Sequence, residues 1–330
     1  MHKEALDLLD NLSGEDKKIV DKFFHEVYRQ EREHYWSITK LFYHAMYIPM
    51  FLQIAQKYYP EQVYIDTHSG PGLAKIGGSD RDVILGSPLL ALRWPKIIAE
   101  NVKQFRKIEK GFTRLYYIDK DPRRISVLKR LSGEPANVNL SVGDANLLLP
   151  KIDVPGNAIV YLFVDPYGSL ESQLGYEALK TFVAGKRVDL MINVLAPNIA
   201  QGLSSIRNKN TLLARIEKLF GEAFCDNRLC EKLGITQPLC NPGPKKASHI
   251  LRAYWCALKR LGYRKYSILP VKFKGTILYY MVLAVKGSGK WIDGYKEFIH
   301  LHAPKDYKTL KNLWLAATGR LASLSRFLEQ

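Results

Sequence analysis

The chain has no long apolar segment. None of the runs in its 330 residues reaches the roughly 18 consecutive apolar residues of a membrane-spanning helix. The first residues, Met1 to Glu4, lead into an amphipathic pattern and not into a signal peptide. We therefore expect a globular, cytoplasmic protein without a membrane partner.

Cysteine is scarce as well. The chain contains only Cys225, Cys230, Cys240 and Cys256, and the first three are spaced C-x4-C-x9-C. This spacing does not match the ligand pattern of a zinc site, so we expect no metal. Free, buried thiols are the default expectation, and a structural disulfide is the alternative.

Acidic residues are rare in the C-terminal quarter. From Lys245 to Gln330 the chain has 17 Lys and Arg residues against 4 Asp and Glu, a net charge of +13. The same quarter holds 13 aromatic residues, and basic surface with interleaved rings suits the phosphates and stacked bases of a nucleic acid. We expect RNA as the partner of this region, with Lys245 and Lys246 as candidate substrate contacts. A solvated basic surface is the alternative.

Acidic residues do occupy one regular position, at the ends of four apolar runs. The four runs end at Asp66, Asp119, Asp144 and Asp165. Such runs predict buried parallel strands, whose carboxyl ends share one edge of a sheet. Open α/β sheets bind their ligands at that edge. Four carboxylates there indicate a ligand that carries hydroxyl and amino groups.

A glycine turn, H-S-G-P-G, follows the first run. Gly70 and Gly72 allow a positive φ and a close approach of the backbone to a ligand. The dinucleotide fingerprint G-x-G-x-x-G fails because Lys75 replaces its last glycine, which disfavours a nicotinamide-dependent dehydrogenase. His68, inside the turn, is a candidate contact of the cofactor or the substrate, and a local hydrogen bond in the turn is the alternative.

The remaining patterns complete a doubly wound α/β fold with a mostly parallel, seven-stranded sheet. Residues 187–194 predict a fifth strand, and residues 266–273 and 276–285 predict a closing hairpin with Lys274-Gly275 as its turn. We expect the following organisation: an N-terminal helical region, 1–58; a main domain, 59–290, with an insertion at about 196–246; and a basic helical tail, 291–330.

Local signals predict where several elements begin and end. Helix breaks are expected near residues 37–39 and at Pro49. Residues 73–85 are expected to form a loop, after which Ser87 caps a helix. In the insertion, residues 212–220 predict a helix.

Five parallel strands, a helix and a terminal hairpin resemble the class I methyltransferase fold, which binds S-adenosyl-L-methionine. This resemblance implies roles for the acidic strand ends. Asp66 and the glycine turn would line the methionine end of the cofactor, and Asp119 would accept hydrogen bonds from the ribose hydroxyls. Asp144 would accept from the adenine amino group, with Ala145 or Asn146 beside the ring.

The fourth run ends in D-P-Y-G, which is Asp165, Pro166, Tyr167 and Gly168. Enzymes that methylate exocyclic amines hold the amino group with acceptors, and the Asp165 carboxylate and the Pro166 carbonyl are of this kind. Tyr167 would stack on a flipped base. The tetrapeptide is similar to that of the tRNA guanine-N2 dimethyltransferases, although the likeness spans only about five residues. A plain β-turn is the structural alternative.

A longer resemblance is to the three-Cys-motif partner (TcmP) family. It rests on four features of residues 36–194: Lys40 in an N-terminal helix, the glycine turn after Asp66, the G-S-P sequence at 86–88, and D-P-Y-G. Here T-H-S replaces the usual G-F-A of the turn. The resemblance implies that Lys40 reaches the substrate and that a radical-SAM protein is a partner; a surface lysine is the alternative for Lys40.

Together these patterns predict an S-adenosyl-L-methionine-dependent RNA methyltransferase that modifies a nucleobase, at an exocyclic amine, in tRNA or rRNA. Asp165, Pro166 and Tyr167 are the candidate catalytic residues, and Gly168 is a candidate substrate contact. A DNA amino-methyltransferase and a non-catalytic partner protein that binds cofactor or RNA are the alternatives.

Overall fold

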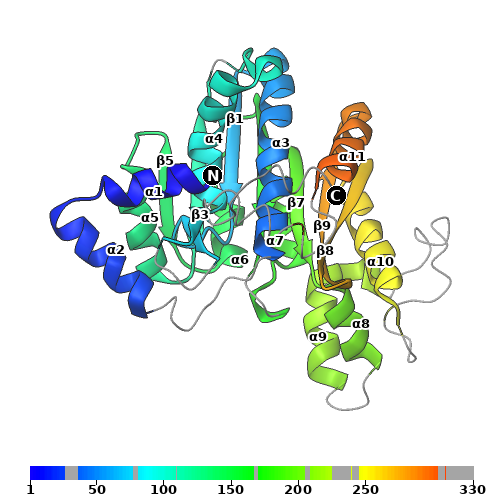
Figure 1. Ribbon diagram of the computed structural model, residues 1–330. Coiled ribbons are helices and arrows are strands. Elements are labelled where there is room, and N and C mark those ends of the chain that lie inside the picture. The colour runs from blue at the N-terminus through cyan, green and yellow to red at the C-terminus, as the bar shows by residue number, and fades with distance from the viewer. Residues whose placement is uncertain are drawn as a thin grey trace.

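A computed structural model describes residues 1–26, 36–76, 81–108, 110–166, 170–204, 209–224, 239, 245–303 and 309. Within these ranges a central sheet is covered by helices on both faces (Figure 1). None of the described helices is long and apolar enough to cross a membrane.

Seven strands form the main sheet, in the order β5-β4-β1-β6-β7-β9-β8. Among the described strands of this sheet, β9 runs in the direction opposite to the other six. The predicted doubly wound, mostly parallel seven-stranded sheet is therefore confirmed. The strands are β1 (Glu61–Asp66), β4 (Arg114–Asp119), β5 (Val138–Val142), β6 (Ala158–Val164), β7 (Arg187–Val194), β8 (Lys265–Phe273) and β9 (Thr276–Val285).

The direction of winding reverses between β1 and β6. From β1 the chain moves outward to β4 and then to β5. It then returns to β6, on the other side of β1, and moves outward again to β7. Such a reversal opens a crevice at the carboxyl ends of the two central strands, where open α/β sheets bind ligands. The fold thus places a candidate ligand site between the ends of β1 and β6.

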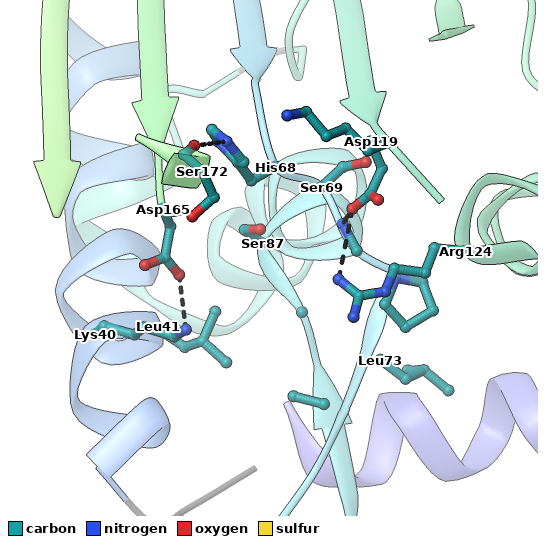
Figure 2. A pocket seen from close by; sticks show the side chains of 16 residues that line it. Lys40, Leu41, His68, Ser69, Leu73, Ser87, Asp119, Arg124, Asp165 and Ser172 are labelled. Carbon is teal, nitrogen blue, oxygen red and sulfur yellow. Dashed lines mark hydrogen bonds and ion pairs between the residues drawn. The ribbon is translucent and has the colours of Figure 1, made fainter. Parts of the chain in front are cut away.

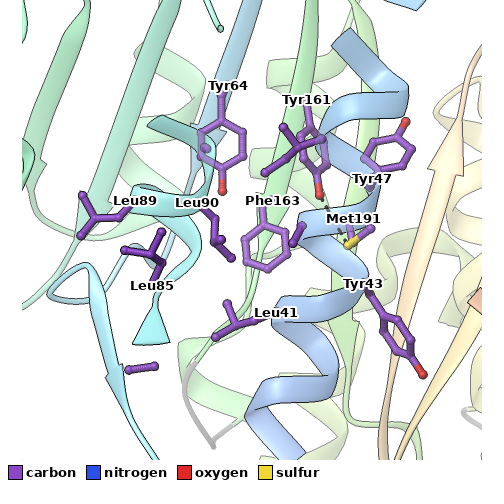
Figure 3. Packing of buried hydrophobic residues seen from close by; sticks show 14 of the residues in the cluster. Leu41, Tyr43, Tyr47, Tyr64, Leu85, Leu89, Leu90, Tyr161, Phe163 and Met191 are labelled. Atoms are coloured by element: carbon purple, nitrogen blue, oxygen red, sulfur yellow. Dashed lines mark hydrogen bonds between the residues drawn. The ribbon is translucent and has the colours of Figure 1, made fainter. Parts of the chain in front are cut away.

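Alternating side chains divide the core into two layers. On β6, Tyr161 and Phe163 belong to one buried cluster, and Val160, Leu162 and Val164 belong to the other. Figure 3 shows Tyr161 and Phe163 between the sheet and α3. Their layer contains α1 (His2–Asp10), α2 (Gly14–Glu26), α3 (Trp36–Tyr58), α4 (Ser87–Asn101), α5 (Pro122–Ser132) and α11 (Lys290–His302). The other contains α6 (Ala145–Leu148), α7 (Tyr176–Val183), α8 (Ala196–Ser204), α9 (Lys209–Phe220) and α10 (Ala247–Arg260).

In the described part of the chain, short 3-10 helices join these elements: η1 (Lys103–Phe105), η2 (Leu149–Lys151), η3 (Leu170–Ser172) and η4 (Gly221–Phe224). The predicted hairpin is confirmed, because β8 and β9 pair up to Phe273 and Thr276 on either side of the two-residue turn. The boundaries of the three predicted regions of the chain stay predictions.

Helix α3 contradicts the predicted break at Pro49, which lies inside it. The other predicted break, near residues 37–39, stays a prediction, because α3 begins at Trp36 and residues 27–35 lie outside the described ranges. A proline inside a helix removes a hydrogen bond and costs about 3 kcal/mol. Around it, Tyr47, Ile48 and Leu52 are fully buried against the sheet layer. Burial of these large side chains offsets the local penalty, which is why the local signal was misleading.

The predicted loop at 73–85 contains a small antiparallel ribbon, formed by β2 (Leu73–Lys75) and β3 (Val83–Leu85). The predicted insertion also contains more helix than expected, since α8 precedes α9. The buried residues of α8, Ala196, Ile199, Ala200 and Leu203, follow helical spacing, so a signal for it was present in the sequence.

Cys256 lies in α10, is 1% exposed and is disulfide-bonded. The default expectation of free thiols is therefore wrong for this residue. The other three cysteines lie outside the described residues. Within the described part of the chain, no group of three or more His, Cys, Asp or Glu residues is arranged to hold a metal ion.

Candidate functional site

A cavity of about 190 Å³ lies at the carboxyl ends of the central strands. Its walls come from α3, from the glycine turn after β1, from the start of α4, and from the ends of β4 and β6 (Figure 2). It therefore occupies the crevice at the reversal of winding between β1 and β6.

The glycine turn is held against the start of α4. Gly86 donates its backbone N–H to the carbonyl of Gly72 at 2.7 Å. A Cβ atom on Gly86 would lie 2.9 Å from that carbonyl oxygen, and one on Gly72, where φ is +91°, would lie 2.9 Å from Leu128 Cδ1. The pairing of β2 with β3 brings the two segments together at Leu73 and Leu85. This contact explains why the two glycine-containing motifs occur together.

Asp66 lies beneath the turn and not in the cavity wall. Its side chain is completely buried and accepts hydrogen bonds from the His68 N–H at 3.1 Å and the Tyr64 hydroxyl at 3.2 Å. Burial raises the pKa of Asp66 to about 7, against the lowering effect of hydrogen bonds from Ser87 and His68. In this structure Asp66 shapes the turn from below.

Ser87 shows why the predicted helix cap is displaced by one residue. The N-cap of α4 is Gly86, and Ser87 is the first residue of the helix. The Ser87 side chain instead forms a hydrogen bond with Asp66. The hydroxyl therefore joins the helix to the carboxylate beneath the turn.

The His68 ring lines the cavity and is fixed at both nitrogens. Nε2 lies 2.8 Å from the Ser172 carbonyl oxygen, and Nδ1 lies 2.8 Å from Thr67 Oγ1. Burial lowers the pKa of His68, which favours the neutral ring. A carbonyl only accepts, so Nε2 carries the proton and Nδ1 accepts from Thr67. The ring thus joins the turn to the segment after β6.

Asp119 ends β4 and also lines the cavity. Its Oδ2 accepts the Gly70 N–H at 2.9 Å, and its Oδ1 accepts the Asp121 N–H at 2.9 Å. Arg124 lies 3.9 Å from Oδ2. Each carboxylate oxygen accepts more than one hydrogen bond, so both retain capacity for hydroxyl donors of a ligand.

Asp144 and Ala145 lie beside the cavity rather than in its wall. Asp144 caps α6 and accepts the Asn146 N–H at 2.9 Å, and Lys120 Nζ lies 3.0 Å from its Oδ2. Burial would raise the pKa of Asp144, but the hydrogen bonds from Asn146 and Lys120 outweigh it and lower the pKa to about 2. Ala145 is 3% exposed and packs in the core. Lys120 lines the cavity and also contacts Asp144, so it links the cavity to the start of α6.

Asp165 is held by two side chains at the opposite wall. Lys40 Nζ lies 2.7 Å from Asp165 Oδ2 (Figure 2), and Asn193 Nδ2 donates to Oδ1 at 3.0 Å. The side chains of Lys40 and Asp165 are 17% and 9% exposed. The carboxylate is therefore fixed at each oxygen, and the alternative of a surface lysine does not hold for Lys40.

Asn193 was not among the predicted site residues, although it carried the same signal as the aspartates. It is a polar residue near the carboxyl end of an otherwise apolar run, and it lies on β7, next to β6. His44 was missed for a different reason. It stands one helical turn after Lys40 within an apolar helix, where a buried histidine has no distinctive spacing.

His44 is completely buried beneath the cavity. Its Nδ1 lies 2.8 Å from the Tyr161 hydroxyl, and its Nε2 lies 3.2 Å from the Ser87 carbonyl and 3.3 Å from the Tyr64 hydroxyl. Burial lowers the pKa of His44 to about 3, so the ring is neutral. The Tyr64 hydroxyl also donates to Asp66. His44, Tyr64 and Asp66 thus form a buried hydrogen-bond network that supports the glycine turn from below.

Several predicted residues lie elsewhere or outside the described ranges. Tyr167 and Gly168 are not described, and Pro166 is buried directly after Asp165. Lys245 is 9% exposed and lies two residues before α10, where its N–H donates to Ser204 Oγ at 3.1 Å. Lys246 follows it and is exposed. Neither lysine lines the cavity described above.

No protein-family model matches the chain, and no curated protein matches it. Solved structures similar to it include a Legionella pneumophila protein of family-model DUF519, 11% identical, with a TM-score of 0.45 over 78% of this chain and 89% of that chain. Trm1 from Pyrococcus horikoshii, solved with S-adenosyl-L-methionine, is 12% identical, with a TM-score of 0.35 over 76% and 57%. Magnesium protoporphyrin IX methyltransferase from Synechocystis, solved with bound SAH, is 10% identical, with a TM-score of 0.36 over 86% and 94%. These TM-scores are below 0.5, so the fold is assigned from strand order and register, and the resemblance to the three-Cys-motif partner family stays a prediction.

Proposed function

We propose that the chain is an S-adenosyl-L-methionine-dependent RNA methyltransferase that modifies a nucleobase, at an exocyclic amine, in tRNA or rRNA. The observation that supports this most directly is the position of Asp165. Its carboxylate is fixed by Lys40 and Asn193 in one wall of a cavity whose other wall carries the glycine turn and Asp119. The Asp165 carboxylate, which can accept hydrogen bonds from an amine, therefore lies across the cavity from the glycine turn and Asp119, which would bind the nucleoside of the cofactor.

The residues present fit such a cofactor. A Cβ atom on Gly70 would meet no atom within 4 Å, so the turn leaves open space on that side. Asp119 would accept from the ribose hydroxyls. The cavity of about 190 Å³ is smaller than the roughly 300–1,000 Å³ of most small-molecule sites. The nucleoside would therefore extend past Lys120 toward Asp144, and Ala145 would lie behind the capping carboxylate.

When bound, the cofactor supplies an electrophilic methyl group. The task of the chain is to orient the amine, because proximity and alignment supply much of the rate of such a transfer. Asp165 accepts one N–H of the amine, and the Pro166 carbonyl accepts the other, which directs the nitrogen lone pair toward the methyl carbon. The amine nitrogen would form a bond to the methyl carbon as the bond between that carbon and the sulfur of the cofactor breaks, which would leave S-adenosylhomocysteine. The nitrogen would then be cationic and would lose one proton, which the Asp165 carboxylate would accept. Tyr167 would stack on the base.

The basic C-terminal region would hold the RNA backbone, with Lys245, Lys246 and Gly168 as proposed substrate contacts. Such binding depends strongly on salt because it releases counterions. DNA and a role as a non-catalytic binding partner are the two rival functions. The radical-SAM partner, implied only by the family resemblance, stays a prediction.

The first test is isothermal titration of the purified protein with S-adenosylhomocysteine, with NADH and ATP as controls. We expect micromolar binding of S-adenosylhomocysteine alone. Transfer of labelled methyl groups to total tRNA, rRNA and single- or double-stranded DNA then identifies the substrate. Asp165→Asn, which keeps the shape of the side chain, should abolish transfer and leave cofactor binding nearly unchanged.

Each rival has its own outcome. Transfer to DNA alone would assign the protein to the DNA amino-methyltransferases. Cofactor binding without transfer to any nucleic acid would favour the non-catalytic role. A folded protein that does not bind S-adenosylhomocysteine would refute the proposal at its base.

A further inference from the structure

The β8–β9 hairpin extends beyond the rest of the sheet at the edge that carries Asp165. The last pair between β7 and β9 is Val194 with Tyr280, whereas β9 begins four residues earlier, at Thr276. At about 3.3 Å per residue, these four residues project about 13 Å past the end of β7. Because β8 and β7 are both antiparallel to β9, the hairpin turn lies on the same edge as the carboxyl ends of β6 and β7.

The projecting part begins beside the helix that carries Lys40. Tyr43 stands one turn after Lys40 on α3, and its hydroxyl donates to the Pro270 carbonyl of β8 at 2.9 Å. In the sheet, β9 is two strands from β6, or about 10 Å at roughly 4.8 Å per strand. The hairpin turn is therefore placed to meet a chain that enters the cavity at Asp165.

The end of the hairpin is basic and exposed. Lys272 and Lys274 are both exposed on either side of Phe273, and the Lys274 ammonium lies 5.5 Å from the centre of the Phe273 ring. No acidic residue occurs from Lys245 to Ile292, a stretch that contains eleven Lys and Arg residues. The end of the hairpin therefore carries two lysines and no acidic residue of its own.

The backbone at Lys274 provides an independent observation. Lys274 has φ +46° and Gly275 has φ +84°, as a two-residue type I′ turn requires. Asn-Gly is the favoured pair for this turn, and a left-handed conformation costs a residue such as lysine about 1–2 kcal/mol. Lysine at position 274 is therefore unfavourable for the backbone of the turn. Residues held in unfavourable backbone conformations cluster at binding and active sites.

We propose that the end of the β8–β9 hairpin, residues 272–275, binds phosphate groups of the RNA next to the target nucleotide. This inference rests on the proposed function, because it takes the substrate to be a nucleic acid. Lys272 and Lys274 supply the two cations, and the rigid turn sets their separation from Asp165. The hairpin thereby fixes the register of the RNA relative to the cavity.

The test compares Lys274→Asn and Lys272→Gln, singly and together, with the unaltered protein. Asparagine suits the left-handed turn, so Lys274→Asn removes the charge without weakening the hairpin, and Tm should stay the same or rise. RNA binding is measured by fluorescence anisotropy at several salt concentrations. We expect each change to raise the RNA Kd roughly three- to tenfold and to reduce the slope of log Kd against log salt by about 0.7–0.9. Affinity for S-adenosylhomocysteine should not change.

The matched control is Lys151→Gln. Lys151 is exposed and lies in η2, toward the opposite edge of the sheet, where the chain enters β6. Its replacement should leave RNA binding unchanged. If the double hairpin variant binds RNA with unaltered affinity and salt slope, the inference is wrong even though the proposed function stands. If the unaltered protein binds S-adenosylhomocysteine but no RNA, the RNA proposal itself fails. Loss of binding to polyglutamate with RNA binding intact would assign the hairpin to an acidic protein and would also overturn the inference.

Discussion

The contact between Lys40 and Asp165 allows a quantitative test of how the site is held. Lys40→Met removes the ammonium and retains an unbranched side chain of similar length. The two side chains are 17% and 9% exposed, and the separation of Nζ and Oδ2 is 2.7 Å. Removing one partner of a buried ion pair costs about 3–5 kcal/mol, because the other charge is left without compensation. Asn193 still donates to Asp165 and the pair lies at a cavity wall, so we expect the lower end, about 3 kcal/mol.

A double-mutant cycle separates the charge pair from other effects of the substitution. Asp165→Asn in the Lys40→Met background removes the charge that the first change leaves uncompensated. The double variant should therefore be more stable than Lys40→Met alone, with a coupling free energy of about 2 kcal/mol. Guanidinium-induced unfolding at pH 7 gives the free energy of unfolding of each of the four proteins. Titration with S-adenosylhomocysteine confirms that each is folded.

The same proteins report on function. Asp165→Asn and the double variant should both lack methyl transfer, since neither has the carboxylate. Lys40→Met should retain Asp165 in a less fixed position and lose activity in part. If the stability changes of the two single variants add up to that of the double variant within about 0.5 kcal/mol, the reasoning is refuted, because additivity would show that the ion pair does not stabilise the site.

Three further outcomes are expected. Gly72 has φ +91°, and a Cβ atom there would lie 2.9 Å from a leucine methyl group. Gly72→Ala should therefore lower the stability more than the control Gly185→Ala, where φ is +68° and the new Cβ would have no atom within 4 Å. Equal losses of stability in thermal unfolding would contradict the packing argument. Burial raises the pKa of Asp189 from 3.8 to about 7, so the folded state binds more protons between these values and its stability falls as pH rises from about 4 to about 7. Asp189→Asn should therefore gain stability relative to the unaltered protein as pH rises through this window, and a pH-independent difference would disprove the assignment. Asn193→Ala removes a hydrogen bond to the Asp165 carboxylate, so we expect kcat to fall roughly tenfold with S-adenosylhomocysteine affinity unchanged; an equal loss of both would indicate a general structural role.

Much of the fold was predictable because its signals are local. The apolar runs before Asp66, Asp119 and Asp165 each became a strand, since a strand buried on both faces must be apolar along its length. The hairpin turn was predictable from Gly275 between two alternating runs, although Lys274 opposes the local preference of such a turn. The uninterrupted helix through Pro49 was not predictable, because the packing that offsets the proline penalty comes from residues distant in the sequence.

The candidate site divides in the same way. The sequence by itself determined which residues stand at the strand ends, since chain order and apolar length specify them. Only the tertiary structure decided their roles: Asp66 is buried beneath the turn, Asp144 caps α6 beside the cavity, and Asp165 is held by side chains from α3 and β7. Burial, ion pairing and hydrogen bonding depend on distances between segments far apart in the chain. Those distances are set by how the helices pack on the sheet, which no local pattern specifies.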